Sequence, residues 1–308
     1  MDFSALIKKS LEIALYNRIL WLFGFLSGGV GSVGYFNQVG TSWQLLENLQ
    51  KPNSGSSKVL KAVTDNPNFF LENLILILLI ILLVILAILL IAMFITNWAG
   101  AALVYSILNR NGERPNWSLG AKAGLKYWWE FFLVAFVLGS LMVAFILSLA
   151  LPVIFLFLAG MRIVALAVSI PAIVIFVLAL LIATPIASLL ITLATRIIVH
   201  KGVGVMDSLR LAGALLRKNK GESLLAWLVS IGLNFAAGFA ITAALLPIIL
   251  ILAMIFIPGF ALGFPFWLGA VSGIPALVLL FAVMGFWQAF NATYWTLFYE
   301  HVASKEGW

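Results

Sequence analysis

The side chains of this chain that could do chemistry are mostly cations: 18 Lys and Arg stand against 11 Asp and Glu, two His and no Cys. The lack of cysteine excludes disulfides and thiolate chemistry, and His200 and His301 alone are too few to build a histidine metal cluster. No nucleophile with a neighbouring base can be assembled from the other residues. We therefore expect a non-enzymatic protein without a cofactor or a metal.

The basic segment from Arg196 to Val229 is the strongest candidate for a binding element. On a helix of 3.6 residues per turn, its cationic and apolar faces lie about 100° apart. The first face holds Asp207, Arg210, Ala214 and Arg217, and the second holds Met206, Leu209, Gly213 and Leu216. A helix with one cationic and one apolar side suits a membrane surface that carries anionic lipid.

Weaker copies of this basic segment recur twice in the chain, and together the three segments predict binding of anionic lipid headgroups. The side chains expected to bind them are Lys8, Lys9, Lys122, Lys126, Arg210, Arg217, Lys218 and Lys220. A protein partner is the second candidate for the same surface. The alternative interpretation, which has at least equal weight, is that these charges only set the topology of the chain.

Uncharged polar residues inside the apolar runs form a second candidate site. They are Asn97, Thr184, Ser188, Asn234, Gln288 and Asn291. Hydrogen bonding between helices is the commonest use of such groups in lipid, and we expect that role first. The alternative is an intramembrane polar site formed by Asn97, Gln288 and Asn291. No acidic residue lies near the centre of an apolar run, which disfavours transport coupled to protons or sodium.

The Glu300-His301 pair could act in acid/base chemistry, but adjacent residues of a helix point about 100° apart. We therefore expect these two side chains to anchor the helix at a membrane interface.

The composition is that of a polytopic membrane protein: 64% of the 308 residues are hydrophobic and 9% are charged, and the mean hydropathy is +1.14. We expect a single transmembrane domain over residues 1–308. A net charge of +7 could suit nucleic acid, yet no exposed basic domain is present to hold it. Membrane lipid, especially anionic lipid, is the expected partner, and nucleic acid is not.

Apolar runs predict an all-α fold with six transmembrane helices, arranged as three hairpins, and amphipathic helices on the cytoplasmic surface. The first surface helix is expected over residues 3–17. The spans are expected at 22–36, 74–95, 131–158, 163–199, 224–257 and 266–299, with a polar loop at 37–70. At 1.5 Å per residue, 163–199 would reach roughly 55 Å against a bilayer core of about 30 Å. This stretch is therefore either one helix that kinks at Pro171 or Pro185 or projects into the cytoplasm, or two segments.

Glycine and proline indicate where the helices end or approach one another. Gly160-Met-Arg162 predicts a tight turn, Gly221 a helix stop and Pro258-Gly259 a second turn. The Gly24-xxx-Gly28 spacing predicts close packing between helices.

The distribution of cations predicts the orientation of the chain. With the N-terminus inside, fourteen of the 18 Lys and Arg fall in inner segments, and only Lys51, Lys58, Lys61 and Arg162 fall outside. This asymmetry follows the positive-inside rule. We expect a multi-pass protein of the cell membrane with both termini in the cytoplasm.

A threefold repeat is also expected, because each odd-numbered span follows a Ser-Leu pair on a basic segment. The pairs are Ser10-Leu11, Ser118-Leu119 and Ser208-Leu209, and the three units would cover residues 3–110, 116–202 and 206–307. The alternative is that any array of hairpins inserted by the positive-inside rule would look similar.

Three short stretches carry a family resemblance: Trp21-Leu-Phe-Gly24, the Val199 to Asp207 segment and the Tyr294 to Tyr299 ending. They resemble a diffuse group of bacterial and archaeal six-span membrane proteins. That group includes the membrane domain joined in some bacteria to a glycerophosphodiester phosphodiesterase. The resemblance implies six helices with cytoplasmic surface helices and no established activity. The soluble barrel of that phosphodiesterase has no counterpart in this chain, so none of its catalytic residues is expected here.

Overall fold

The computed structural model describes residues 2–29, 67–110, 116–261 and 266–308, and within them the fold is all-helical, with no strand. Five helices of 40 or 42 residues dominate it, and three shorter helices accompany them. The long helices are α5 (Pro67–Leu108), α6 (Trp117–Leu158), α7 (Arg162–Lys201), α9 (Lys220–Ala261) and α10 (Phe266–Lys305). The shorter ones are α1 (Phe3–Tyr16), α2 (Arg18–Gly24) and α8 (Val205–Lys218); a π-helical turn, η1 (Phe25–Gly29), extends α2.

Four helices in the described part of the chain are long and apolar enough to cross a membrane. They cover Leu78–Leu108, Trp117–Leu158, Leu166–Lys201 and Lys220–Ala243. By length and composition, these helices indicate that the chain is a membrane protein. The expectation of a helical membrane protein is confirmed at this level.

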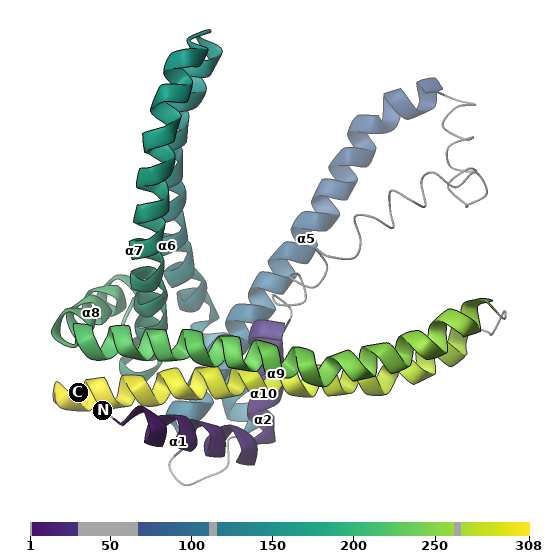
Figure 1. Cartoon of the computed structure of the whole chain (residues 1–308). Coiled ribbons are helices and arrows are strands. Elements are labelled where there is room, and N and C mark those ends of the chain that lie inside the picture. Colours follow the sequence, from purple (N-terminus) through teal and green to yellow (C-terminus); the bar gives the residue numbers. More distant parts are fainter. Residues whose placement is uncertain (1, 30–66, 111–115, 262–265) are drawn as a thin grey trace.

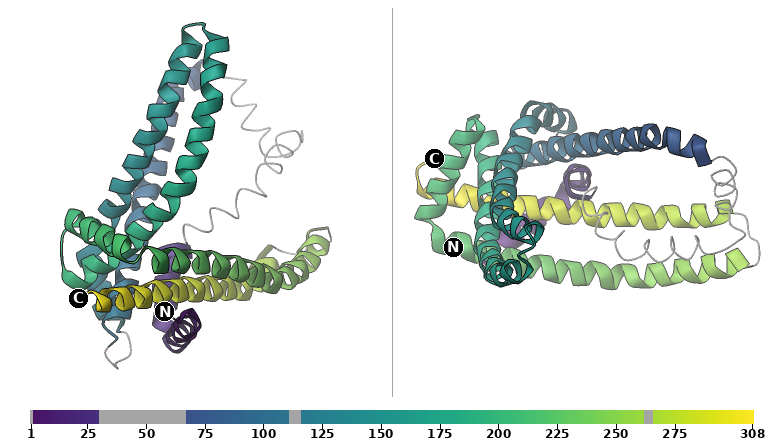
Figure 2. Two further views of the ribbon diagram at one scale, coloured as in Figure 1. Left: turned by 60° about the vertical axis from the view of Figure 1, so that its left-hand side comes forward. Right: turned by 90° about the horizontal axis from the view of Figure 1, so that it is seen from above.

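The long helices form three arms that diverge from a common base (Figure 1). Helix α5 makes one arm, α6 and α7 lie side by side in the second, and α9 and α10 lie side by side in the third (Figures 1 and 2). We use the term base for α1, α2 and α8 together with the ends of the long helices that pack against them. Both chain termini lie at this base (Figure 1).

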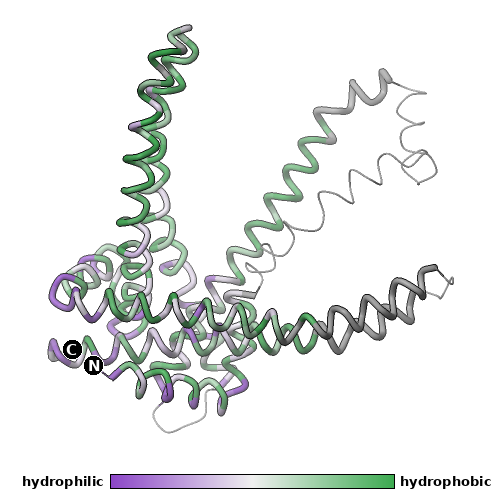
Figure 3. Tube along the Cα trace, viewed as in Figure 1, coloured by the Kyte–Doolittle hydropathy of each residue, from purple (hydrophilic) through white to green (hydrophobic). Residues whose placement is uncertain are grey.

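Hydrophilic residues gather at the base, whereas the arms are hydrophobic along their described length (Figure 3). The arms also leave large apolar side chains open: Leu82 is 66% exposed, Phe155 71% and Phe235 77%. Apolar surface of this extent needs a lipid covering.

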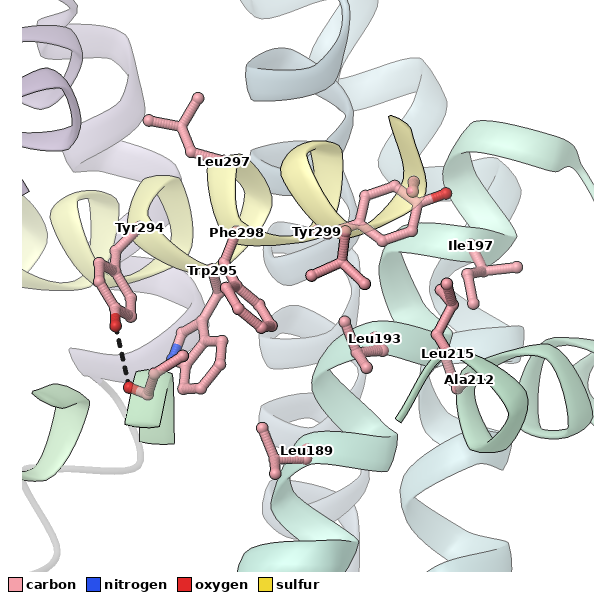
Figure 4. Close-up of a cluster of buried hydrophobic side chains, with 14 of the residues drawn as sticks. Leu189, Leu193, Ile197, Ala212, Leu215, Tyr294, Trp295, Leu297, Phe298 and Tyr299 are labelled. Carbon is pink, nitrogen blue, oxygen red and sulfur yellow. Dashed lines mark hydrogen bonds between the residues drawn. The ribbon is translucent and has the colours of Figure 1, made fainter. Parts of the chain in front are cut away.

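The hydrophobic core lies in the base, where the last turns of α7 and α10 meet α8 (Figure 4). Leu193 and Ile197 of α7 pack with Leu215 of α8 and with Phe298 of α10, and all four are fully buried or nearly so. Tyr294 of α10 donates a hydrogen bond from its hydroxyl to the carbonyl of Ala226 in α9, at 2.9 Å (Figure 4). The core therefore joins two of the three arms.

Glycines bring α2 and α10 into close contact, as the Gly24-xxx-Gly28 spacing predicts. A Cβ atom on Gly24 would collide with the backbone of Gly285, and one on Gly28 with the side chain of Gln288. A Cβ on Gly285 would in turn collide with the carbonyl of Trp21. The predicted close packing is confirmed.

Several expected boundaries differ from the observed ones. Residues 163–199 form part of one continuous helix, α7, which runs through Pro171 and Pro185, so the two-segment alternative is wrong. The Gly160 turn is confirmed, because Gly160 adopts a left-handed backbone with φ of 79° after α6. Pro258-Gly259 does not end a helix, since α9 continues to Ala261.

Gly221 is not a helix stop. Helix α8 ends instead at Lys218, and the cap residue Asn219 donates from its side-chain amide to the Leu215 carbonyl at 3.3 Å. The Asn219 carbonyl then accepts from the Ser223 amide at 2.9 Å, so α9 starts at once with Gly221 in its first turn. Side-chain capping by asparagine thus decides the boundary in place of glycine.

Most of the expected first span, 22–36, and of the polar loop, 37–70, lies outside the described residues.

Candidate functional site

All eight predicted headgroup-binding cations are exposed, and all belong to helices of the base. Lys8 and Lys9 lie on α1, Lys122 and Lys126 on the first turns of α6, and the other four on α8 and the start of α9. Three of the eight are engaged with neighbours. Lys218 pairs with Glu306, Arg210 lies 3.7 Å from Asp207, and Lys126 lies 4.8 Å from the centre of the Tyr127 ring.

The remaining five predicted cations make no ion pair with a described residue: Lys8, Lys9, Lys122, Arg217 and Lys220. Two of them, Arg217 and Lys220, come from different helices and line the same groove.

The groove lies between α7, α8 and α9 and has a volume of about 610 Å³. Apart from its two cations, it is apolar, and its lining consists of Leu181, Ile182, Pro185, Ile186, Leu189, Leu190, Gly213, Leu216, Arg217, Lys220 and Leu224. Part of its α8 wall comes from the apolar face that the sequence predicts, through Gly213 and Leu216. The neighbouring residues Ser208, Ala212 and Leu215 turn into the core instead. Helix α8 therefore packs one face against the core, and its neighbouring face, with Gly213 and Leu216, lines the groove.

A separate polar cavity of about 510 Å³ lies where all three arms converge. Six elements of the described chain line it: η1, α5, α6, α7, α9 and α10. The lining residues are Ser27, Gly100, Leu103, Val104, Phe131, Ser188, Ile191, Thr192, Thr195, Arg196, Trp227, Ser230, Ile231, Asn234, Gln288, Asn291, Ala292 and Trp295. The cavity brings together two residues of the predicted intramembrane polar site, Gln288 and Asn291. Neither makes a hydrogen bond to a described residue.

Asn97, the third residue of the predicted polar site, does not line this cavity. Its side-chain amide donates to the Met93 carbonyl of its own helix at 2.8 Å. Two other polar residues noted in the apolar runs, Ser188 and Asn234, do line the cavity, and Asn234 donates to the Ser230 carbonyl at 2.8 Å. The site is therefore built around α7, α9 and α10, with no contribution from Asn97.

Arg196 is the residue of this cavity that sequence reasoning missed. Its side chain is buried, with 8% exposure, and its Nη1 donates to the Thr192 carbonyl at 2.9 Å and to the Thr195 hydroxyl at 3.1 Å. No carboxylate of the described chain pairs with it, and its buried Nε has no hydrogen-bond partner there. The available signal was an arginine five residues before the end of α7, which opens the predicted basic segment but was not among the predicted site residues.

The last turns of α10 hold an ion-pair network at the base. Glu300 accepts from Arg110, two residues beyond the end of α5, at 2.6 Å, and Lys305 donates to Glu222 of α9 at 2.7 Å. His301 lies 3.7 Å from the other oxygen of Glu222. Glu300 and His301 thus reach different partners, as their helical spacing predicts: Glu300 ties α10 to the segment that follows α5, and His301 lies against α9 of the same arm.

Comparison with known proteins places the chain by family. No curated protein and no solved structure matches it. The resemblance to the membrane domain of glycerophosphodiester phosphodiesterases gains no support from these comparisons. One family model, however, matches residues 9–300, which is nearly the whole chain, and the protein therefore belongs to DUF7544, a family of unknown function.

Proposed function

We propose that this protein is a non-enzymatic integral membrane protein that binds anionic phospholipid in the groove between α7, α8 and α9. One observation carries the proposal: an apolar groove of about 610 Å³ that contains two exposed cations from two different helices. An acyl chain would pack against the leucines and isoleucines of α7, and the phosphate would pair with Arg217 and Lys220.

The charges of the groove favour an anionic headgroup over a zwitterionic one. Arg217 and Lys220 have no ion-pair partner among the described residues, so a lipid phosphate does not compete with a carboxylate for them. Each cation near an anionic membrane surface contributes about 1 kcal/mol. The apolar walls favour a lipid over a soluble anion, because burial of an acyl chain contributes about 0.8 kcal/mol per methylene.

The membrane arrangement that accompanies this function has six spans in three hairpins, with both termini and the base in the cytoplasm of a cell-membrane protein. Four long apolar helices and the concentration of hydrophilic residues at the base support it (Figure 3). In this arrangement the groove opens at the level of the cytoplasmic leaflet, where anionic lipids are found.

Lipid binding can be measured on the full chain in detergent with a fluorescent phosphatidylglycerol, against phosphatidylcholine as the reference lipid. Combined reversal of the groove charges, Arg217→Glu with Lys220→Glu, should weaken phosphatidylglycerol binding by about 30-fold or more, the equivalent of about 2 kcal/mol. The matched control, Arg18→Glu with Lys201→Glu, makes the same change in net charge at exposed positions outside the groove. It should leave binding within about threefold of wild type.

A third variant separates the groove from a diffuse basic surface. If Lys122→Glu with Lys126→Glu weakens binding as much as the groove variant does, the cations act as a general collar and the groove proposal is wrong. Unchanged binding in the groove variant would leave these charges with a topological role or with a protein partner.

A carrier or flippase for a lipid or apolar solute is the second candidate function. The polar cavity favours it, because a cavity lined by Gln288 and Asn291 at the convergence of three arms offers a polar group a place inside the membrane. This function requires transbilayer movement of labelled lipid in proteoliposomes, and a rate equal to that of empty liposomes would rule it out.

A further inference from the structure

We propose that the polar cavity binds an oxyanion, a phosphate or a carboxylate, on the free edge of the Arg196 guanidinium. This site is distinct from the lipid groove and does not depend on it. The two share helices α7 and α9 but no lining residue.

The hydrogen bonds of Arg196 leave the buried Nε side of its guanidinium group without a partner among the described residues. Nη1 is engaged with Thr192 and Thr195 on the same helix, which fixes the orientation of the group. Nε and Nη2, which lie together on the other edge, have no hydrogen-bond partner among the described residues. That edge presents two parallel N–H donors, the geometry that recognises a carboxylate or a phosphate in a bidentate manner.

The burial of Arg196 indicates that its charge has a binding role. A buried charge without a counter-ion is costly, so a structure that keeps one usually supplies it with a partner. The described residues supply no carboxylate within ion-pairing distance, so a bound anion would provide the missing negative charge. The rest of the lining fits such a ligand, since Gln288 and Asn291 offer amide groups that make no hydrogen bond to another described residue.

The oxyanion could be a free ion or the phosphate of a lipid headgroup, and two probes distinguish these sources. Inorganic phosphate is titrated calorimetrically into the full chain in phosphatidylcholine nanodiscs. In the second arm, phosphatidic acid is added to the nanodiscs and bound lipid is counted by native mass spectrometry. The second arm uses the Arg217→Glu, Lys220→Glu background, so that only the cavity can retain the lipid.

At least one probe should bind, and Arg196→Gln should weaken that binding tenfold or more. Arg196→Lys keeps the charge but loses the paired donors, so binding should fall by an intermediate factor. The matched control, Arg18→Gln, removes an exposed arginine from α2 and should bind as wild type does. Binding of phosphate alone identifies a free ion as the ligand, and binding of phosphatidic acid alone identifies a headgroup.

Asn291→Leu keeps the test decisive if Arg196→Gln does not fold. It alters the cavity from α10 and should weaken binding of the same probe severalfold. The proposal is overturned if neither probe binds the wild type, or if the folded Arg196 or Asn291 variants bind as tightly as wild type. If the wild type binds inorganic phosphate, the Arg217→Glu, Lys220→Glu variant should bind it equally well. Loss of phosphate binding in that variant would place the oxyanion in the groove and overturn the cavity site.

Discussion

Gly285 lies where α10 crosses α2, and the contact leaves no room for a methyl group. Its added Cβ would overlap the Trp21 carbonyl oxygen and approach the Trp21 carbonyl carbon to 3.0 Å. The obstructing atoms belong to the backbone, which cannot move aside as a side chain can. Small residues at such crossings let helices pack closely in membranes, where van der Waals contact replaces the hydrophobic effect between helices.

Gly285→Ala should therefore lower the free energy of unfolding by about 1–3 kcal/mol, the usual cost of overpacking. Thermal unfolding of the detergent-solubilised protein, followed by circular dichroism, measures the change. Gly232→Ala on α9 is the matched control, because nothing lies within 4 Å of its added Cβ. The control should be neutral or slightly stabilising, since alanine favours a helix by about 1 kcal/mol over glycine. Equal stability of both variants would contradict the observed crossing.

At the scale of the element, ion pairs at the end of α10 tie this helix to the segment after α5, to α8 and to its neighbour α9. Glu300 pairs with Arg110 just after α5, and Lys305 pairs with Glu222 at the start of α9. Glu306, just after α10, pairs with Lys218 at the end of α8. The arms diverge beyond the base (Figures 1 and 2), and α5 and α6 of two different arms also pack together there, with Trp98 donating to the Ala121 carbonyl at 3.0 Å.

The Arg110–Glu300 pair should show a coupling of about 1 kcal/mol in a double-mutant cycle with Arg110→Ala and Glu300→Ala. Its side chains are only 25% and 35% exposed, which places it at the upper end for ion pairs near a surface. The Asp207–Arg210 pair, at 66% and 83% exposure, provides the comparison and should show coupling near zero. A coupling near zero for both pairs would mean that α5 and α10 are held together by packing alone.

At the scale of the whole molecule, the apolar arms and the hydrophilic base predict one orientation in the membrane. The chain has no native cysteine, so single cysteines can report accessibility without background. Lys122→Cys and Arg210→Cys, both at exposed positions of the base, should react with a membrane-impermeant maleimide only from the cytoplasmic side. Arg162→Cys, beside the turn between α6 and α7, should react only from the opposite side. Labelling of Lys122→Cys or Arg210→Cys from outside would overturn the six-span arrangement.

The threefold repeat stays a prediction. The middle unit departs from the expected pattern in one respect, because its basic segment and its span form a single helix, α6, that starts at Trp117. The described residues before α6 form no separate surface helix, whereas α8 and α9 are distinct helices divided at Asn219.

Element type and membrane character could be predicted from the sequence because they depend on local properties. A long apolar run forms a helix wherever it enters lipid, and the observed α1, Phe3–Tyr16, lies within one residue of the expected 3–17. A helix boundary is less predictable where two neighbouring residues can each end the helix, as Asn219 and Gly221 can between α8 and α9. The prolines of α7 and α9 likewise permitted continuous helices where turns or breaks were expected.

By itself, the sequence determined that the chain is helical, apolar and basic at defined segments, because those properties belong to single stretches. Only the tertiary structure decided that Arg196 of α7 lines the same cavity as Gln288 and Asn291 of α10, while Asn97 faces elsewhere. It also decided that Arg217 and Lys220 line one apolar groove. The physical reason is that side chains about a hundred residues apart meet only through the angle and rotation at which helices pack, and no local pattern encodes that geometry.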